Sequence, residues 1–310
     1  MRSACHRAIS SFVILLAVSG CSLKTMAANT VANTLSQSGD TFSRDDDPQL
    51  VREAVPFALK TYESLLETVP KHEGLLLATC SAFTQYAYAF IQTDAELIEA
   101  TDYEAATQMK QRALKLYLRG QDYCRRLLEL RKRGVMATLQ VDPANALGWA
   151  SRDDVPVLYW TGASWGAAIS IGLDRPELIA DMPAVKALME RALALQEDYN
   201  QGAIHAVMIS LEALPEAMGG STARARRHFE RAVELSGGND PAPYVTLAAS
   251  VAVPAQNRKE FETLLEHAVA IDPDKNPSMR LPTLIAQKRA RHLLSRVDDL
   301  FVPPVEENVK

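Results

Sequence analysis

The chain has 310 residues, of which 47% are hydrophobic and 6% aromatic, and its formal net charge is −5 at pH 7. This acidic balance, with lysine and arginine scattered along the chain, gives no support for nucleic-acid binding. The hydrophobic content is sufficient for a packed core, and abundant alanine with few aromatic residues favours closely packed helices over strands.

The first twenty residues have the layout of a secretion signal. A positively charged start is followed by an apolar run over residues 12–18 and by small residues directly before Cys21. The run is too short to span a bilayer well. The arrangement resembles a bacterial lipobox, so residues 1–20 are interpreted as a signal peptide with a lipobox, and the resemblance implies diacylation of Cys21. The alternative is an ordinary signal peptide cleaved near Ala27-Ala28.

Residues 21–47 are rich in serine, threonine, asparagine and aspartate and show little periodicity. We therefore expect a flexible tether between lipid and domain. Ser22 follows the cysteine, and by resemblance to lipoprotein sorting this favours the outer membrane. The expected location is the periplasmic side of a bacterial envelope. No later apolar run is interpreted as long enough to span a bilayer, so the lipid is expected to be the only anchor.

Apolar residues recur at helical spacing from Pro48 onward. One stripe runs from Val51 to Leu66. A second helix, Leu75 to Ile98, is apolar around most of its circumference and is expected to be buried. A long third helix, Tyr103 to Arg133, has basic residues near its end and Gly134 as a stop.

Two cysteines, Cys80 and Cys124, remain if Cys21 is acylated. An oxidising compartment permits a disulfide between them. Both lie on predicted apolar helix faces, where a buried free thiol is equally ordinary. The sequence leaves this choice open.

A four-residue pattern occurs four times: a small residue, an aliphatic residue, any residue and a second aliphatic residue. Its copies begin at Ala113, Ala192, Ala232 and Ala268. Its spacings are 79, 40 and 36 residues, and the first is close to twice the second. Alanine lets paired helices approach closely. The pattern predicts an all-α, tetratricopeptide-like helical-repeat domain, with a solenoid-like arrangement, over residues 48–301. A final helix from Leu284 to Phe301 is expected to cap the repeat. Residues 302–310 are expected to form a disordered tail.

The sequence shows no catalytic fingerprint. The histidines of the mature chain lack HExxH or HxH spacing, and no GxSxG, P-loop or Rossmann motif occurs. His228 and His267 occupy equivalent polar positions in repeat helices, which a solvated face explains. We therefore expect neither an enzyme nor a bound metal or cofactor.

The segment LYWTGASWGAAISIG, residues 158–172, is unusually rich in small residues beside aromatic ones. Such a helix lets a neighbouring backbone or a ligand come very near, and its aromatic rings could wall an apolar cavity. Tight helix packing around two core tryptophans is the alternative, and periodicity alone favours it. The candidate cavity-lining residues are Tyr159, Trp160 and Trp165.

Four segments carry a resemblance: LYWTGASWG, MPAVKALMERALALQEDYNQGAIH, MGGSTARARRHFERAVELSGG and AQNRKEFETLLEHAVAIDPDKNPSMRLPTLIAQKRARHLLSRVDDLF. Together they resemble the T component of TRAP transporters, the TatT family. The resemblance covers roughly residues 45–301, is strongest after Val155 and is weakest over 135–150, where the local structure is uncertain. It implies a periplasmic lipoprotein with cryptic tetratricopeptide-like repeats that assembles as a homotrimer. It also implies docking to the solute-binding protein of a TRAP system, and an apolar channel for a hydrophobic, amphipathic or organic-acid solute.

Two functions compete on this basis. The first is an accessory of a TRAP-type transport system that handles a solute without covalent chemistry. The alternative is a tetratricopeptide lipoprotein scaffold for envelope assembly or secretion, which predicts peptide binding in a groove and a solid core around the tryptophans.

Overall fold

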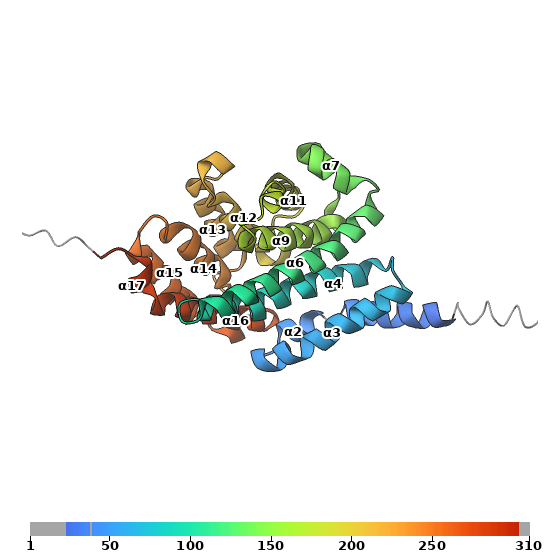
Figure 1. Cartoon of the computed structure of the whole chain (residues 1–310), viewed down its shortest axis with the longest axis horizontal. Helices are drawn as coiled ribbons and strands as arrows, with labels where there is room; N and C mark the ends of the chain where they lie inside the picture. The colour runs from blue at the N-terminus through green and yellow to red at the C-terminus, as the bar shows by residue number, and fades with distance from the viewer. Residues whose placement is uncertain (1–22, 38, 304–310) are drawn as a thin grey trace, which may run out of the picture.

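The structure is a computed structural model that describes residues 23–37 and 39–303, and every regular element within these ranges is helical (Figure 1). The all-α prediction is therefore confirmed. The tetratricopeptide-like repeat and the solenoid-like arrangement remain predictions.

The helices of the first half follow a segment 23–36 that is itself helical. They are α2 (Gly39–Ser43), α3 (Pro48–Thr68), α4 (Glu73–Tyr86), the π-helix η1 (Ala87–Gln92), α5 (Thr93–Ile98), α6 (Tyr103–Arg131), α7 (Val135–Val141), α8 (Pro143–Ala146), η2 (Arg152–Asp154) and α9 (Val155–Ile171). The second half comprises α10 (Pro176–Ile179), α11 (Met182–Leu195), η3 (Tyr199–Gln201), α12 (Ala203–Glu212), η4 (Glu216–Met218), α13 (Thr222–Leu235), α14 (Ala242–Leu247), the π-helix η5 (Ala248–Ala252), α15 (Arg258–Ala270), η6 (Pro273–Lys275), η7 (Pro277–Met279), α16 (Arg280–Ser295) and α17 (Val297–Leu300).

The long helix α6 organises the first half of the molecule. It packs along α4 on one side and α9 on the other, and α9 in turn packs on α11. The Asp102 side chain starts α6 by accepting a hydrogen bond from the backbone N–H of Ala105 at 2.9 Å. The helix ends at Arg131, two residues before the predicted end, and Gly134 takes the left-handed conformation with φ of 80°.

The four alanines that begin the predicted repeat are all buried. Ala113, Ala192, Ala232 and Ala268 are each at most 1% exposed, and they lie on α6, α11, α13 and α15. They therefore lie where helices meet, which is the packing role that the spacing predicted. The region 135–150, where the sequence was least informative, folds into α7 and α8.

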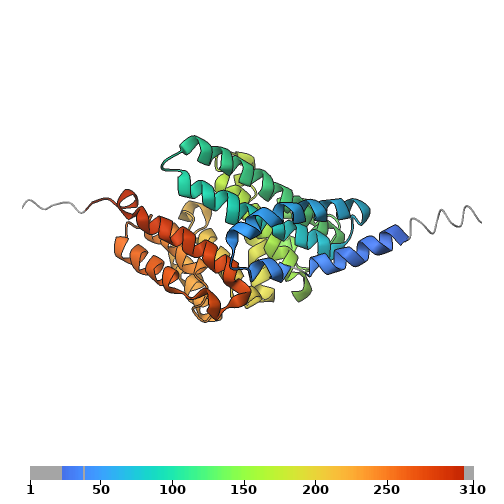
Figure 2. The same ribbon diagram turned by 90° about the horizontal axis from the view of Figure 1, so that it is seen from below.

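The predicted capping helix differs from the observed one in its bounds and its neighbours. It begins at Arg280 rather than Leu284, and it breaks at Arg296, before the short α17. It packs on α15, and it also returns to the N-terminal helices α2, α3 and α5 (Figure 2). Two ion pairs hold it there: Lys288 Nζ lies 2.9 Å from Asp94 Oδ1, and Arg289 Nε lies 2.7 Å from Glu96 Oε2.

The segment expected to be a flexible tether contains a helix over residues 23–36. Ala28 and Ala32 lie in the core, and the Leu35 carbonyl accepts a hydrogen bond from the Tyr62 hydroxyl at 3.5 Å. Much of this segment is therefore helical and contacts the domain. Residues 1–20 and Cys21, as well as residues 304–310, lie outside the described residues.

The continuous helical stretch Glu73–Ile98 is long and apolar enough to cross a membrane by length and composition alone. The interpretation that no later run could span a bilayer was therefore too strict. Its mean hydropathy is 1.2 and 56% of its most apolar window is buried inside the domain, which is typical of the core helix of a soluble protein. The prediction that this stretch is buried fits that observation.

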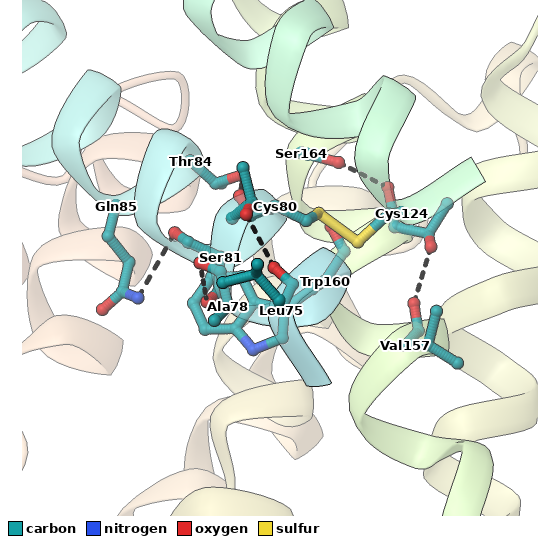
Figure 3. Close-up of a disulfide and its surroundings, with 12 residues drawn as sticks. Leu75, Ala78, Cys80, Ser81, Thr84, Gln85, Cys124, Val157, Trp160 and Ser164 are labelled. Atoms are coloured by element: carbon teal, nitrogen blue, oxygen red, sulfur yellow. Dashed lines mark hydrogen bonds between the residues drawn. A yellow bond between two sulfur atoms is a disulfide. The ribbon is translucent and has the colours of Figure 1, made fainter. Parts of the chain in front are cut away.

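A disulfide joins α4 to α6 (Figure 3). Cys80 and Cys124 are both fully buried, and their Cα atoms are 5.5 Å apart. Cys80 Sγ also lies 3.9 Å from the Trp160 carbonyl oxygen of α9. The bridge therefore lies where α4, α6 and α9 meet, and it answers the question that the sequence left open.

Candidate ligand cavity

A cavity of about 1980 Å³ lies among the helices. This is larger than the roughly 300–1,000 Å³ of ordinary small-molecule pockets. Its walls come from the helix over 23–36, from α3, α4, α6, α9, α12, α14 and α16, and from both π-helices. Most of the lining side chains are apolar or small, so the walls favour an apolar occupant.

Two of the three predicted site residues line this cavity. Tyr159 and Trp160 of α9 do so, together with Ala163 and Ala167, which follow Trp160 at helical spacing. Trp165 does not line it. The two tryptophans are five positions apart in the chain, which places them on different sides of the helix.

Trp165 is instead part of the core between helices. Its side chain is only 2% exposed, and the Arg125 guanidinium lies 5.9 Å from the centre of its ring. Close packing is visible on the same helix at Gly162, where a Cβ would come within 2.9 Å of Met189 Cε of α11. Both interpretations of this segment therefore apply, each to a different face of α9.

Three aromatic rings cluster at one wall. The ring centres of Tyr159 and Trp160 are 5.0 Å apart, and those of Tyr159 and Tyr199 are 5.2 Å apart. Burial is the main reason why the pKa of Tyr199 rises to about 12, and the neighbouring side chains of Trp160 and Asn200 oppose this rise. Burial also raises the pKa of Tyr159. All four residues line the cavity.

A polar network of side chains forms another part of the wall. The Tyr117 hydroxyl donates to Gln92 Oε1 at 2.6 Å, and Gln92 Nε2 donates to Glu96 Oε1 at 3.0 Å. Arg289 Nε donates to Glu96 Oε2 at 2.7 Å, and Arg289 Nη1 lies 3.4 Å from the Tyr88 hydroxyl. The Arg289 charge is therefore already neutralised by Glu96, and burial raises the pKa of Tyr117 well above its ordinary value.

Both π-helices line the cavity. Tyr88, Ala89 and Phe90 of η1 contribute to its wall, as do Ala249 and Ser250 of η5. Wide turns of this kind are rare and occur frequently at functional sites. Their shared position supports the cavity as the functional centre of the fold.

Sequence reasoning missed Asp240, which also lines the cavity. Its Oδ1 accepts a hydrogen bond from the backbone N–H of Ala242 at 2.9 Å, which is a common way to start a helix. In sequence, Asp240-Pro241-Ala242 therefore indicates only a turn, and no signal there distinguishes a cavity residue. Burial raises the pKa of the Asp240 carboxyl.

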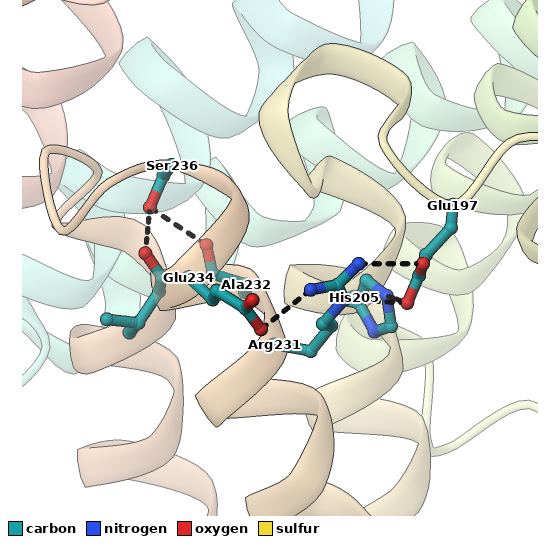
Figure 4. Close-up of polar contacts among 7 residues, drawn as sticks. Glu197, His205, Arg231, Ala232, Glu234 and Ser236 are labelled. Atoms are coloured by element: carbon teal, nitrogen blue, oxygen red, sulfur yellow. Dashed lines mark hydrogen bonds and ion pairs between the residues drawn. The ribbon is translucent and has the colours of Figure 1, made fainter.

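Two histidines that are well separated in sequence meet across α12 and α13. His205 Nδ1 lies 2.8 Å from His228 Nδ1. His205 Nε2 lies 3.3 Å from Glu197 Oε1, and Arg231 Nε donates to the same oxygen at 2.8 Å (Figure 4). The expectation of a solvated face was wrong for His228, which is half-buried in this pair. His267 is exposed, as expected, and it stacks on the Tyr244 ring with centres 4.3 Å apart.

The histidine pair predicts a loss of stability in mild acid. Burial is the main reason why the folded-state pKa of both His205 and His228 lies below 6.5. The unfolded chain therefore binds more protons below about pH 6.5, and the free energy of unfolding falls as the pH drops, by at most about 1.4 kcal/mol per pH unit for each proton. Urea unfolding at pH 7.5 and 5.0 measures this.

The matched variant is His205→Gln/His228→Gln, which removes both titrating groups. We expect it to flatten the pH dependence between 7.5 and 5.0. Glu197 does not interfere in this window, because hydrogen bonds from Arg231, the largest effect, lower its pKa to about 2. An equally steep pH dependence in the double variant would assign the effect to other groups.

No group of three or more histidine, cysteine, aspartate or glutamate side chains suited to a metal ion occurs within residues 23–37 and 39–303. The sequence Asp153-Asp154 marks the start of a helix. Asp154 Oδ2 accepts hydrogen bonds from both the backbone N–H and the hydroxyl of Ser151 at 2.9 Å.

Two comparisons with known proteins complete this description. A family model described as "TRAP transporter T-component" matches residues 44–301. An uncharacterised protein of Treponema pallidum (strain Nichols) is 33% identical over 311 aligned residues, which cover 94% of this chain and 96% of the relative. The matched region contains all of the helices from α3 to α17.

Proposed function

This chain belongs to the TRAP transporter T-component family, and on that basis we propose that it holds an apolar solute in its cavity for exchange with the solute-binding protein of a TRAP system. The family is transport-associated and implies a location at the cell envelope. The observation that carries the proposal is the cavity of about 1980 Å³ with Tyr159 and Trp160 in its wall.

The walls suit reversible holding of a solute. Binding of an apolar solute to the apolar and small side chains of the wall is favourable, because it removes apolar surface from water. The charged side chains of Arg289 and Glu96 already pair with each other and need no charged ligand. Solute transfer requires release, so modest affinity for solute and partner is expected. No covalent step is part of this function.

The envelope arrangement forms the rest of the proposal. Acylated Cys21 anchors the chain in the outer membrane, on its periplasmic side, and the domain over residues 48–301 docks the solute-binding protein. Three copies form a homotrimer, and the cavity of each copy serves as its channel. Light scattering of the purified chain measures the number of copies.

Trp160→Ala tests the solute-holding role. We expect the full chain in lipid nanodiscs to bind the neutral fluorescent probe N-phenyl-1-naphthylamine saturably, after subtraction of empty nanodiscs. Loss of the indole from the wall is expected to weaken binding by about tenfold, because an aromatic contact contributes about 0.5–1.5 kcal/mol beyond area burial and about 1.4 kcal/mol corresponds to a factor of ten. Val141→Ala is the control, because Val141 is 87% exposed and does not line the cavity.

Absence of saturable probe binding by the wild-type chain would contradict the solute-holding role. Equal affinity of the Trp160→Ala and Val141→Ala variants would place the probe elsewhere. Circular dichroism of each variant separates loss of binding from loss of fold.

Affinity capture of periplasmic proteins by the full chain tests the partner. Mass spectrometry is expected to identify a solute-binding protein of the TRAP type. Retention of envelope-assembly or secretion components, with no solute-binding protein, would favour the scaffold function instead.

A further inference from the structure

Asp240 differs from the other partly buried carboxylates of the cavity wall. Glu96 pairs with Arg289, and Glu99 Oε1 lies 2.5 Å from Lys110 Nζ. Asp240 has no ion-pair partner within the described part of the chain, and its only hydrogen bond there goes to Oδ1. A carboxylate in an apolar cavity is costly without a counter-charge. The second oxygen, Oδ2, can therefore bind a positively charged group of a ligand.

The aromatic cluster lines the same cavity as this carboxylate. The Asp240 charge contributes, after burial, to the raised pKa of both Tyr159 and Tyr244, so it lies within electrostatic reach of each. Tyr159 is in ring contact with both Trp160 and Tyr199. The cavity lining thus combines a carboxylate without a cation and three aromatic rings.

Each of these features attracts the same chemical group. The faces of tyrosine and tryptophan rings carry negative potential and attract ammonium ions, and tryptophan does so most strongly. A carboxylate oxygen without a partner accepts the N–H groups of an ammonium in a charge-assisted hydrogen bond. Shielding from water strengthens both interactions.

We propose that the cavity binds a molecule with an apolar body and a positively charged amine, whose ammonium group contacts Asp240 Oδ2 and the rings of Tyr159, Trp160 and Tyr199. This inference rests on the proposed solute-holding role and names the chemical class of the solute. It differs from an organic acid, because the two partly buried cations of the lining are already paired, Arg289 with Glu96 and Lys110 with Glu99, and the third, Arg175, is exposed.

Three ligands of equal length test the proposal: octylammonium, octanol and octanoate at pH 7. The full chain in lipid nanodiscs is titrated with each by calorimetry, with empty nanodiscs subtracted. We expect octylammonium to bind at least about tenfold more tightly than octanol or octanoate. In Asp240→Asn, which keeps an oxygen for the Ala242 N–H, the preference should shrink to within about twofold.

Asp174→Asn is the matched control, because Asp174 also lines the cavity but is exposed. We expect it to keep the tenfold preference. Trp160→Leu is a second variant that retains apolar volume and removes the ring. It should weaken octylammonium more than octanol, and so it tests the proposal even if Asp240→Asn fails to fold.

The outcomes separate the two proposals. Equal binding of octanol and octylammonium, or tighter binding of octanoate, would overturn the ammonium site and leave solute holding intact. Failure of all three ligands and of the neutral naphthylamine probe would overturn both. Unchanged amine preference in both Asp240→Asn and Trp160→Leu would also overturn the site.

Discussion

Cys80→Ala/Cys124→Ala is expected to lower the free energy of unfolding by about 4 kcal/mol, because the disulfide closes a loop with a sequence separation of 44 residues. A cross-link of this span removes conformations mainly from the unfolded chain. Thermal unfolding should shift down by about 8 °C or more, as judged from domains of 150–250 residues. Circular dichroism during heating measures the shift.

Reduction of the wild-type chain provides the control for this prediction. Dithiothreitol should lower the melting temperature of the wild type toward that of the double variant and leave the double variant itself unchanged. Equal melting temperatures of oxidised and reduced wild type would contradict the prediction. The probe affinity of the folded double variant then shows whether the contact between Cys80 and Trp160 also matters for the cavity wall.

The long helices could be predicted because their apolar residues repeat at a single helical period. The predicted helix over Leu75–Ile98 lies within Glu73–Ile98, and the predicted end of α6 differs from the observed one by two residues. The helix over 23–36 was missed because its buried contacts are made by small residues, Ala28 and Ala32, among polar neighbours. Such a helix shows little hydrophobic periodicity, although these alanines are four positions apart and so lie on one face of it.

The cavity was predictable only in part. The small and aromatic residues of α9 indicated that a neighbouring backbone or a ligand comes close to this helix. Their assignment to two faces required knowledge of what each face contacts, which is α11 and Arg125 on one side and the cavity on the other. The pair His205–His228 joins two different helices, and Asp240 and Tyr159 come from distant parts of the chain to line one cavity. The local sequence pattern contains no information on which distant residues come together, because this depends on how the helices pack.

Trp165→Ala is expected to cost about 3–5 kcal/mol of unfolding free energy, the range for removing a large buried aromatic side chain. Trp165 is 2% exposed and the Arg125 guanidinium lies 5.9 Å from the centre of its ring, so its removal leaves a cavity and takes away this cation–π contact. Urea unfolding followed by circular dichroism measures the loss without dependence on tryptophan fluorescence.

Trp160→Ala is the matched comparison, since it removes the same side chain from the cavity-lining face of the same helix. Its indole already borders open space, so it should cost clearly less stability than Trp165→Ala while weakening probe binding more. The two variants are thus expected to have opposite effects, because Trp165 contributes mainly to stability and Trp160 mainly to ligand binding. Equal stability losses, with equal probe affinities in the folded variants, would mean that both tryptophans serve only the packing of α9 and that the cavity wall does not need Trp160.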